Sequence, residues 1–129
     1  MNELRATFPP WNVYNAQCPT RHVLDLISGR WANLVIGALA NEVLRFGELR
    51  RRADGVSNKS LSKTLKDLER SGIISRTVFA EVPPRTEYKL TDLGRSLTEP
   101  LAALRAWSES NIEHILAARA DYVESLADA

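Results

Sequence analysis

The sequence predicts a mainly α-helical domain that carries one small β-hairpin, and two observations support this fold class. From Pro19 onward, apolar residues recur at spacings of three and four, which is the period of amphipathic helices. Between residues 73 and 90 the period changes, and two β-rich segments flank a proline-containing tip. With 129 residues, the chain is long enough for one domain and too short for two of ordinary size.

The amino-terminal part predicts an irregular arm followed by three helices. Residues 1–17 form the arm, because adjacent prolines interrupt any regular period, and its aromatic side chains are expected to pack on the domain or on a second subunit. The first helix starts at Pro19, since proline suits the first helical position. A second helix runs from Trp31 after a break at glycine, and a brief third one covers residues 45–52.

The clearest helix opens at Ser57. A serine at this position can accept a backbone N–H that has no partner within the helix. Leu61, Leu65 and Leu68 follow at spacings of four and three and form one apolar stripe. The pair Ser71-Gly72 is expected to close this helix, because glycine favours helix ends.

A hairpin and a long helical region follow. Residues 73–79 and 86–90 favour strands, whereas the prolines at 83 and 84 cannot donate within a central strand and mark the tip. Thr91 is a candidate cap for the next helix, in which Pro100 either introduces a kink or opens another helix. The predicted parts are the arm (1–17), a helix-and-hairpin domain (18–90) and carboxy-terminal helices (91–129).

The charges of the chain are unevenly distributed. The whole chain carries a net charge of +1, with 17 basic and 16 acidic side chains. Residues 45–89 hold eleven basic and six acidic side chains, whereas residues 91–129 hold three and seven. The middle of the chain is therefore a basic module, which the total charge conceals.

Three short helices followed by a hairpin with a basic tip are the element order of a winged helix-turn-helix. In that fold the helix at 57–71 would enter the major groove of DNA, and the wing at 83–86 would contact the backbone or the minor groove. Lysines opposite the leucine stripe would contact phosphates, and Asn58 could reach base edges. The residues expected to contact DNA are Arg45, Arg51, Ser57, Asn58, Lys59, Ser62, Lys63, Lys66, Arg85 and Thr86. The alternative is that these lysines form an ordinary solvated helix face.

The sequence also resembles the HxlR-type transcriptional regulators, relatives of the MarR-type repressors. The blocks that carry the resemblance are Cys18-Pro19, Leu26-Ile27-Ser28-Gly29-Arg30-Trp31, Arg45-Phe46-Gly47-Glu48-Leu49, Val56-Ser57-Asn58-Lys59, Leu65-Lys66-Asp67-Leu68-Glu69, Gly72-Ile73-Ile74-Ser75-Arg76, Val82-Pro83-Pro84-Arg85-Thr86-Glu87-Tyr88, Leu90-Thr91-Asp92-Leu93-Gly94 and Trp107. The resemblance covers roughly residues 18–108 and implies a homodimer that binds operator DNA. Arg30 and Asn58 depart from it, since the family often has lysine and glutamine there, and the second change could alter which base is read.

Apolar residues in the arm and in the carboxy-terminal helices predict a dimer interface. A domain this small cannot easily bury both sets by itself. The candidates are Trp11, Tyr14, Leu101, Leu104, Trp107, Ile112 and Ile115. Two-fold symmetry would place two reading helices about 34 Å apart on a pseudo-palindromic operator. The alternative is that these residues close the core of the monomer.

The single cysteine, Cys18, excludes an intrachain disulfide and a cysteine-based zinc finger. It precedes Pro19 and would therefore cap the first helix, where the helix dipole and free N–H groups favour the thiolate. Cys18 is thus a candidate redox or electrophile sensor. The alternative is a small buried residue beneath the arm.

The predicted function is a dimeric, sequence-specific transcriptional regulator, expected to act as a repressor and to respond to a redox signal, an electrophile or a small molecule. The alternative is a winged helix that binds a protein without binding DNA. The sequence contains no motif for catalysis, a metal or a phosphate loop, so we expect no enzyme activity and no cofactor. No apolar stretch approaches the roughly 20 residues of a membrane span, and no secretory signal is visible, so we expect a cytoplasmic protein without a membrane partner.

Overall fold

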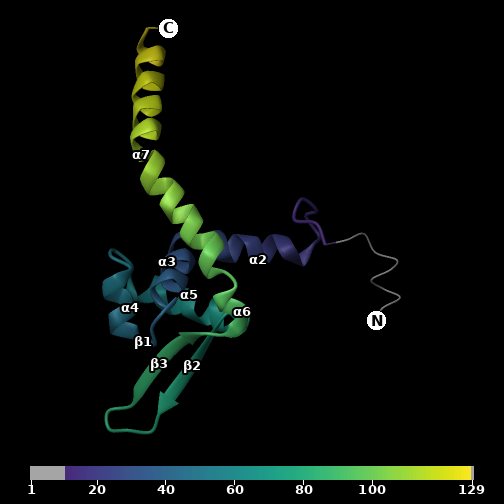
Figure 1. Cartoon of the computed structure of the whole chain (residues 1–129), viewed down its shortest axis with the longest axis vertical. Helices are drawn as coiled ribbons and strands as arrows, with labels where there is room; N and C mark the ends of the chain where they lie inside the picture. The colour runs from purple at the N-terminus through teal and green to yellow at the C-terminus, as the bar shows by residue number, and fades with distance from the viewer. Residues whose placement is uncertain (1–10, 129) are drawn as a thin grey trace.

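A computed structural model describes residues 11–128 as helices packed on a small sheet (Figure 1). The helices are α2 (Pro19–Ser28), α3 (Arg30–Ala38), α4 (Phe46–Arg52), α5 (Asn58–Arg70), α6 (Asp92–Arg95) and α7 (Thr98–Ala127). The strands β1 (Leu44–Arg45), β2 (Ile74–Phe79) and β3 (Arg85–Leu90) form an antiparallel sheet in the order β1-β3-β2. This is the predicted winged helix-turn-helix, so the fold class is confirmed.

The sheet has one strand more than the predicted hairpin. Strand β1 pairs with the outer edge of β3, where Leu44 lies opposite Tyr88 and Arg45 opposite Glu87. Two residues are too few to show an alternating pattern in the sequence. The side chain of Leu44 is nevertheless buried in the core, so β1 attaches the base of the wing to the start of α4.

The ends of the predicted helices agree with their local chemistry. Gly29 has an extended conformation and separates α2 from α3, as the break in the sequence predicted. The Ser57 hydroxyl accepts the backbone N–H of Ser60 at 3.0 Å and caps α5. Thr91 caps α6 in the same way, accepting the N–H of Gly94 at 3.1 Å. Pro100 lies in the first turn of α7, so of the two alternatives it opens a new helix.

The core lies where α3, α5 and the sheet meet. Its buried apolar side chains include Val35, Ile36, Leu49, Leu61, Leu65, Leu68, Ile74 and Leu90. Trp31 and Phe46 are partly buried and pack against this core. On α2, by contrast, Val23 and Leu24 remain about half exposed, at 49% and 45%.

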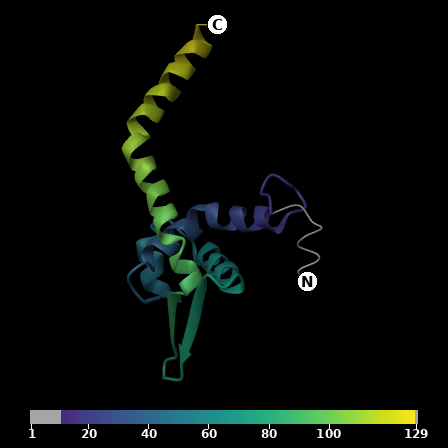
Figure 2. The ribbon, with the colours of Figure 1, turned by 45° about the vertical axis from the view of Figure 1, so that its right-hand side comes forward.

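Helix α7 is fixed to the domain only near its start. The Arg105 guanidinium donates to the side chain and the backbone carbonyl of Asn33 on α3, with distances of 2.5 and 3.3 Å. Gly37 leaves room for this guanidinium, because a Cβ there would lie 2.8 Å from its central carbon. The later turns of α7 project away from the rest of the chain in both views (Figures 1 and 2).

Candidate nucleic-acid interface

Helix α5 shows one buried face and one polar face. Its leucines are buried in the core, as predicted, so the helix is fixed on its scaffold. Asn58, Ser62 and Lys66 follow at spacings of four and therefore share one polar face, which we call the reading strip. Asn58 and Lys66 are exposed and Ser62 is partly exposed. Lys59 lies beside this strip and is also exposed.

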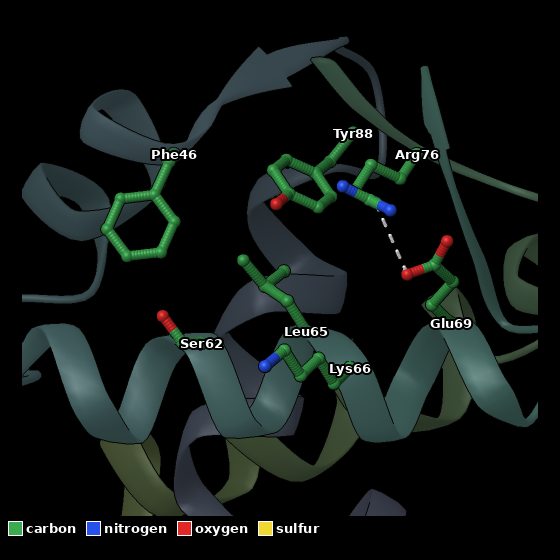
Figure 3. A pocket seen from close by; sticks show the side chains of 7 residues that line it. All are labelled: Phe46, Ser62, Leu65, Lys66, Glu69, Arg76 and Tyr88. Atoms are coloured by element: carbon green, nitrogen blue, oxygen red, sulfur yellow. Dashed lines mark ion pairs between the residues drawn. The ribbon is translucent and has the colours of Figure 1, made fainter. Parts of the chain in front are cut away.

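The reading strip borders a groove between α5 and the wing. Ser62 and Lys66 form one wall, and Phe46 at the start of α4 and Tyr88 on β3 form the other (Figure 3). At the far end, Arg76 on β2 pairs with Glu69 on α5 at 3.5 Å (Figure 3). Because both side chains are partly exposed, this pair contributes little stability, but it connects the wing to the reading helix.

The Tyr88 hydroxyl remains protonated in this groove. Partial burial raises the pKa of the Tyr88 phenol above its usual value, and the positive charge of Arg76 opposes the shift only in part. The hydroxyl therefore keeps its proton at neutral pH and can act as a hydrogen-bond donor to a phosphate.

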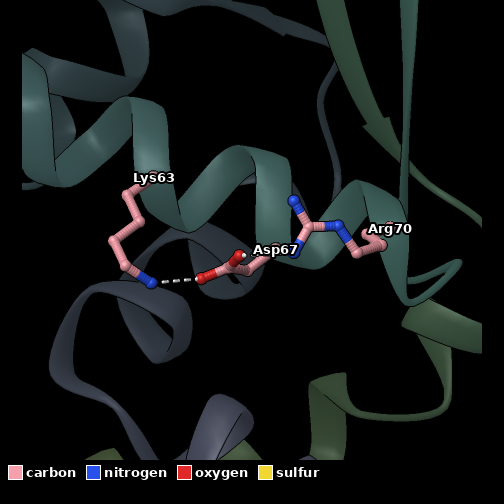
Figure 4. A network of polar contacts seen from close by, with 3 residues as sticks. All are labelled: Lys63, Asp67 and Arg70. Atoms are coloured by element: carbon pink, nitrogen blue, oxygen red, sulfur yellow. Dashed lines mark hydrogen bonds and ion pairs between the residues drawn. The ribbon is translucent and has the colours of Figure 1, made fainter.

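Lys63 lies on the other flank of α5. It forms an ion pair with Asp67 at 2.8 Å, and Arg70 approaches the same carboxylate at 3.5 Å (Figure 4). The hydrogen bond from Lys63 holds the pKa of Asp67 below its usual value, so the pair stays charged at neutral pH. Lys63 also borders a groove towards His22 on α2, whereas Lys66 faces the wing. Lys63 and Lys66 therefore border different grooves, although their spacing keeps both on the exposed side of α5 with Lys59.

Arg85 on the wing interacts with neighbouring side chains. Its guanidinium lies 4.1 Å from the centre of the Phe79 ring and 3.4 Å from the carboxylates of both Glu81 and Glu87. Arg85 belongs to β3 and precedes Thr86, which is partly buried, so neither residue is at the tip of the wing. The exposed tip instead consists of residues 80–84.

The remaining predicted DNA-contacting residues lie on or beside α4 and α5. Arg45 and Arg51 are exposed at the two ends of α4. The backbone N–H of Arg45 donates to the Glu48 carboxylate at 2.9 Å. This hydrogen bond at the start of α4 does not involve the Arg45 guanidinium. The Ser57 hydroxyl is used by the helix cap. Arg50, on the same side of α4 as the start of α5, donates from Nη1 to the Asn58 Oδ1 at 2.9 Å.

The sequence of the region that forms α5 and the wing matches a known protein family. A model described as HxlR-like helix-turn-helix matches residues 26–116. The chain belongs to the HxlR-like helix-turn-helix family. It is 43% identical over 108 residues to YtfH of Escherichia coli, an uncharacterised HTH-type transcriptional regulator, which covers 84% of this chain and 86% of YtfH.

Solved structures place this HxlR-like protein among transcriptional regulators. The structure of YtfH from Salmonella typhimurium superimposes with a TM-score of 0.80 at 42% identity, covering 84% of this chain and 96% of YtfH. The redox regulator HypR in its reduced form gives a TM-score of 0.70 at 33% identity, covering 77% of this chain and 98% of HypR. This HxlR-like protein is therefore a transcriptional regulator of the helix-turn-helix type.

The predicted dimer residues of this HxlR-like protein differ in their exposure. Leu101 is buried in the core of its own chain, so the monomer-core alternative describes this residue. Leu104 and Trp107, one and two turns further along α7, are 52% and 57% exposed, and Ile112 is 44% exposed, whereas Ile115 is partly buried. In the arm, Trp11 and Tyr14 are 69% and 87% exposed, so they do not pack on the domain.

Cys18 combines features of both alternatives. It is the amino-terminal cap residue of α2, as predicted, and its side chain is only 7% exposed. The Thr20 hydroxyl lies 3.0 Å from Sγ, and the backbone N–H of Asn12 donates to Sγ at 3.3 Å. The contact with Thr20 lowers the pKa of the Cys18 thiol, and burial opposes the shift only in part. The thiol is therefore buried and still inclined to ionise.

The interface contains three residues that the sequence did not single out as DNA-contacting. Tyr88 and Arg76 belong to the groove beside the reading strip, and Arg50 contacts Asn58. Strand alternation could have placed Arg76 opposite Tyr88 on one face. The contact of Arg50 depends on the angle between α4 and α5, for which the sequence carries no local signal.

Two further observations concern the described part of the chain. Among residues 11–128, no helix combines the length and the apolar character that crossing a bilayer needs. In the same residues, histidine, cysteine, aspartate and glutamate side chains do not gather in a group of three that could hold a metal ion.

Proposed function

We propose that this HxlR-like regulator is a homodimeric repressor that reads a pseudo-palindromic operator with α5 in the major groove. The observation that carries the proposal is the reading strip, because small polar side chains and a lysine face outward from a helix whose leucines anchor it. Asn58 and Ser62 are of the type that reads base edges, and Lys59 and Lys66 of the type that binds phosphates. Such a regulator would act in the cytoplasm, in contact with the DNA.

The wing contributes less charge to this interface than the sequence suggested. Two carboxylates compensate the charge of Arg85, so its contact with a phosphate requires it to leave Glu81 and Glu87. Both pairs are partly exposed and weak, so the rearrangement costs little. We therefore assign most of the electrostatic binding energy to α5 and to the arginines at the ends of α4, with Arg85 and Thr86 as secondary contacts.

Replacing Lys66 by alanine should weaken binding to every DNA sequence and reduce the salt slope of the affinity by about one unit, because one phosphate contact is lost. The measurement is fluorescence anisotropy with labelled DNA from upstream of the gene and its neighbour, against scrambled DNA, across a salt series. Lys63→Ala is the matched control. It should change the slope less, because Asp67 already neutralises Lys63. If wild type and Lys66→Ala showed the same salt slope, Lys66 would not contact a phosphate.

The same titration separates the two functional classes. A regulator of this kind retains its preference for one upstream DNA over scrambled competitor at physiological salt. A winged helix that serves protein contacts instead shows equally weak binding to both DNAs, and that binding disappears as the salt concentration rises. Equal and weak binding to all upstream DNA would therefore favour the protein-binding alternative.

We further propose that Cys18 makes DNA binding sensitive to oxidation. The thiol has a lowered pKa, and the similar protein HypR is a redox regulator. The chain has one cysteine, so oxidation joins two chains or adds a small thiol. Cys18→Ser should bind DNA as wild type does when reduced and should lose the response to diamide. Anisotropy before and after oxidation, with intact mass to identify the adduct, checks this. Wild type that binds equally well in both states would contradict the proposal.

A further inference from the structure

The contact between α4 and α5 involves two exposed polar residues at the point where the reading helix begins. Arg50 lies in the last turn of α4, and Asn58 is the first residue of α5. Nη1 of Arg50 lies 2.9 Å from Oδ1 of Asn58, and both side chains are exposed. They therefore form a polar pair at the amino-terminal end of the reading strip. In helix-turn-helix proteins, the amino-terminal residues of the recognition helix are the ones that contact base edges.

The chemistry of the pair fixes the orientation of the asparagine amide. A guanidinium has only donors, so the amide atom that faces Arg50 must be the oxygen. The amide nitrogen, with its two donors, is then turned away from Arg50. The outward side of the pair therefore presents mainly N–H groups, from Asn58 and from the remaining guanidinium nitrogens.

This orientation changes which base the asparagine fits. A free asparagine binds adenine with two hydrogen bonds, donating to N7 and accepting from the N6 amino group. The second bond needs the amide oxygen, and here the guanidinium that donates to this oxygen places a positive charge beside it, which disfavours the approach of a further N–H donor. Guanine presents two neighbouring acceptors, N7 and O6, in the major groove and fits a surface of donors.

We propose that Arg50 and Asn58 act as one reading unit that selects guanine at the base edge facing the start of α5. The inference rests on the proposed DNA binding. It adds Arg50 as a residue that determines specificity, because Arg50 holds the Asn58 amide in one orientation. If the pair were only a surface contact that joins α4 to α5, its removal would leave the base preference unchanged.

The test is enrichment of bound duplexes from a randomised DNA library, followed by sequencing. Asn58→Asp identifies the base concerned, because the carboxylate keeps its contact with Arg50 and loses the amide donors. Aspartate also suits the first turn of a helix, so this variant should fold. The base pair read by Asn58 is the motif position at which wild type and Asn58→Asp prefer different bases. There, wild type should favour guanine by about tenfold, and Asn58→Asp should favour cytosine, which offers an amino donor.

Arg50→Ala tests the positioning role. Freed from Arg50, Asn58 can use its oxygen, so the preference at that position should move from guanine to adenine. Arg52→Ala is the matched control, because it removes the same charge from the same helix while its partner is Glu42, at 2.6 Å, and not α5. It should lower the affinity and keep the guanine preference.

The possible outcomes distinguish this inference from the proposed function. A wild type that enriches no sequence overturns both. A wild type that enriches a motif with adenine at this position, or an Arg50→Ala variant that keeps the wild-type preference, overturns the reading unit and leaves DNA binding intact.

Discussion

Replacing Leu104 and Trp107 together by glutamate should convert the proposed dimer to a monomer and lower operator affinity about a hundredfold or more. Both side chains are more than half exposed on a helix that leaves the body of its own chain. In the proposed dimer they would be buried, where two unpaired carboxylates are strongly unfavourable. The monomer would lose the advantage of two linked half-sites, which is worth about 10² to 10⁴ in affinity.

Light scattering coupled to size-exclusion chromatography measures the mass, and anisotropy measures the affinity. The matched control is Ala106→Glu with Ala117→Glu, which adds the same charge to exposed positions on the opposite face of α7. This control should remain dimeric. A Leu104/Trp107 variant that stays dimeric with unchanged affinity would show that the two chains do not meet on this face of α7.

The sequence could predict Leu101 and Leu104 only as members of one stripe, although the structure separates them. Their spacing of three residues places both on one face of α7. Leu101 packs into the core because the first turns of α7 lie against α3, whereas Leu104 is exposed because the helix then leaves the domain. The exit point of α7 depends on tertiary contacts such as the bond from Arg105 to Asn33, which join positions 72 residues apart.

The elements predicted correctly are those whose signals are local. Caps such as Ser57 and Thr91 act within three residues, and the leucines of α5 report one face of one helix. The surroundings of Arg85 were harder to predict, because its aromatic partner depends on strand register. Phe79 lies opposite Arg85 only once β2 and β3 are paired, and this register brings the aromatic ring to the guanidinium, whereas Glu81 and Glu87 are close to Arg85 in the sequence. A basic residue in a wing therefore does not by itself indicate a free positive charge.

Replacing Gly94 by alanine should destabilise the fold by about 3 kcal/mol, in the range of severe overpacking. A Cβ at this position would lie only 2.1 Å from the backbone carbonyl oxygen of Ile73. That oxygen accepts hydrogen bonds from the N–H of Thr91 at 3.0 Å and from its hydroxyl at 3.1 Å. The clash cannot be relieved by rotating a side chain, and moving the backbone would break bonds that join the end of α5 to the start of α6.

Urea unfolding followed by circular dichroism, at one fixed protein concentration, measures this effect through the midpoint. Gly47→Ala is the matched control, because its Cβ would meet only a side-chain nitrogen of Arg51 at 3.7 Å within α4. Alanine costs less conformational entropy than glycine in a helix, so this control should unfold at the same or a higher urea concentration. If Gly94→Ala unfolded at the wild-type midpoint, the backbone of α6 would have to lie further from Ile73. The turn that leads from the wing into the helices of the proposed dimer would then differ from the one described.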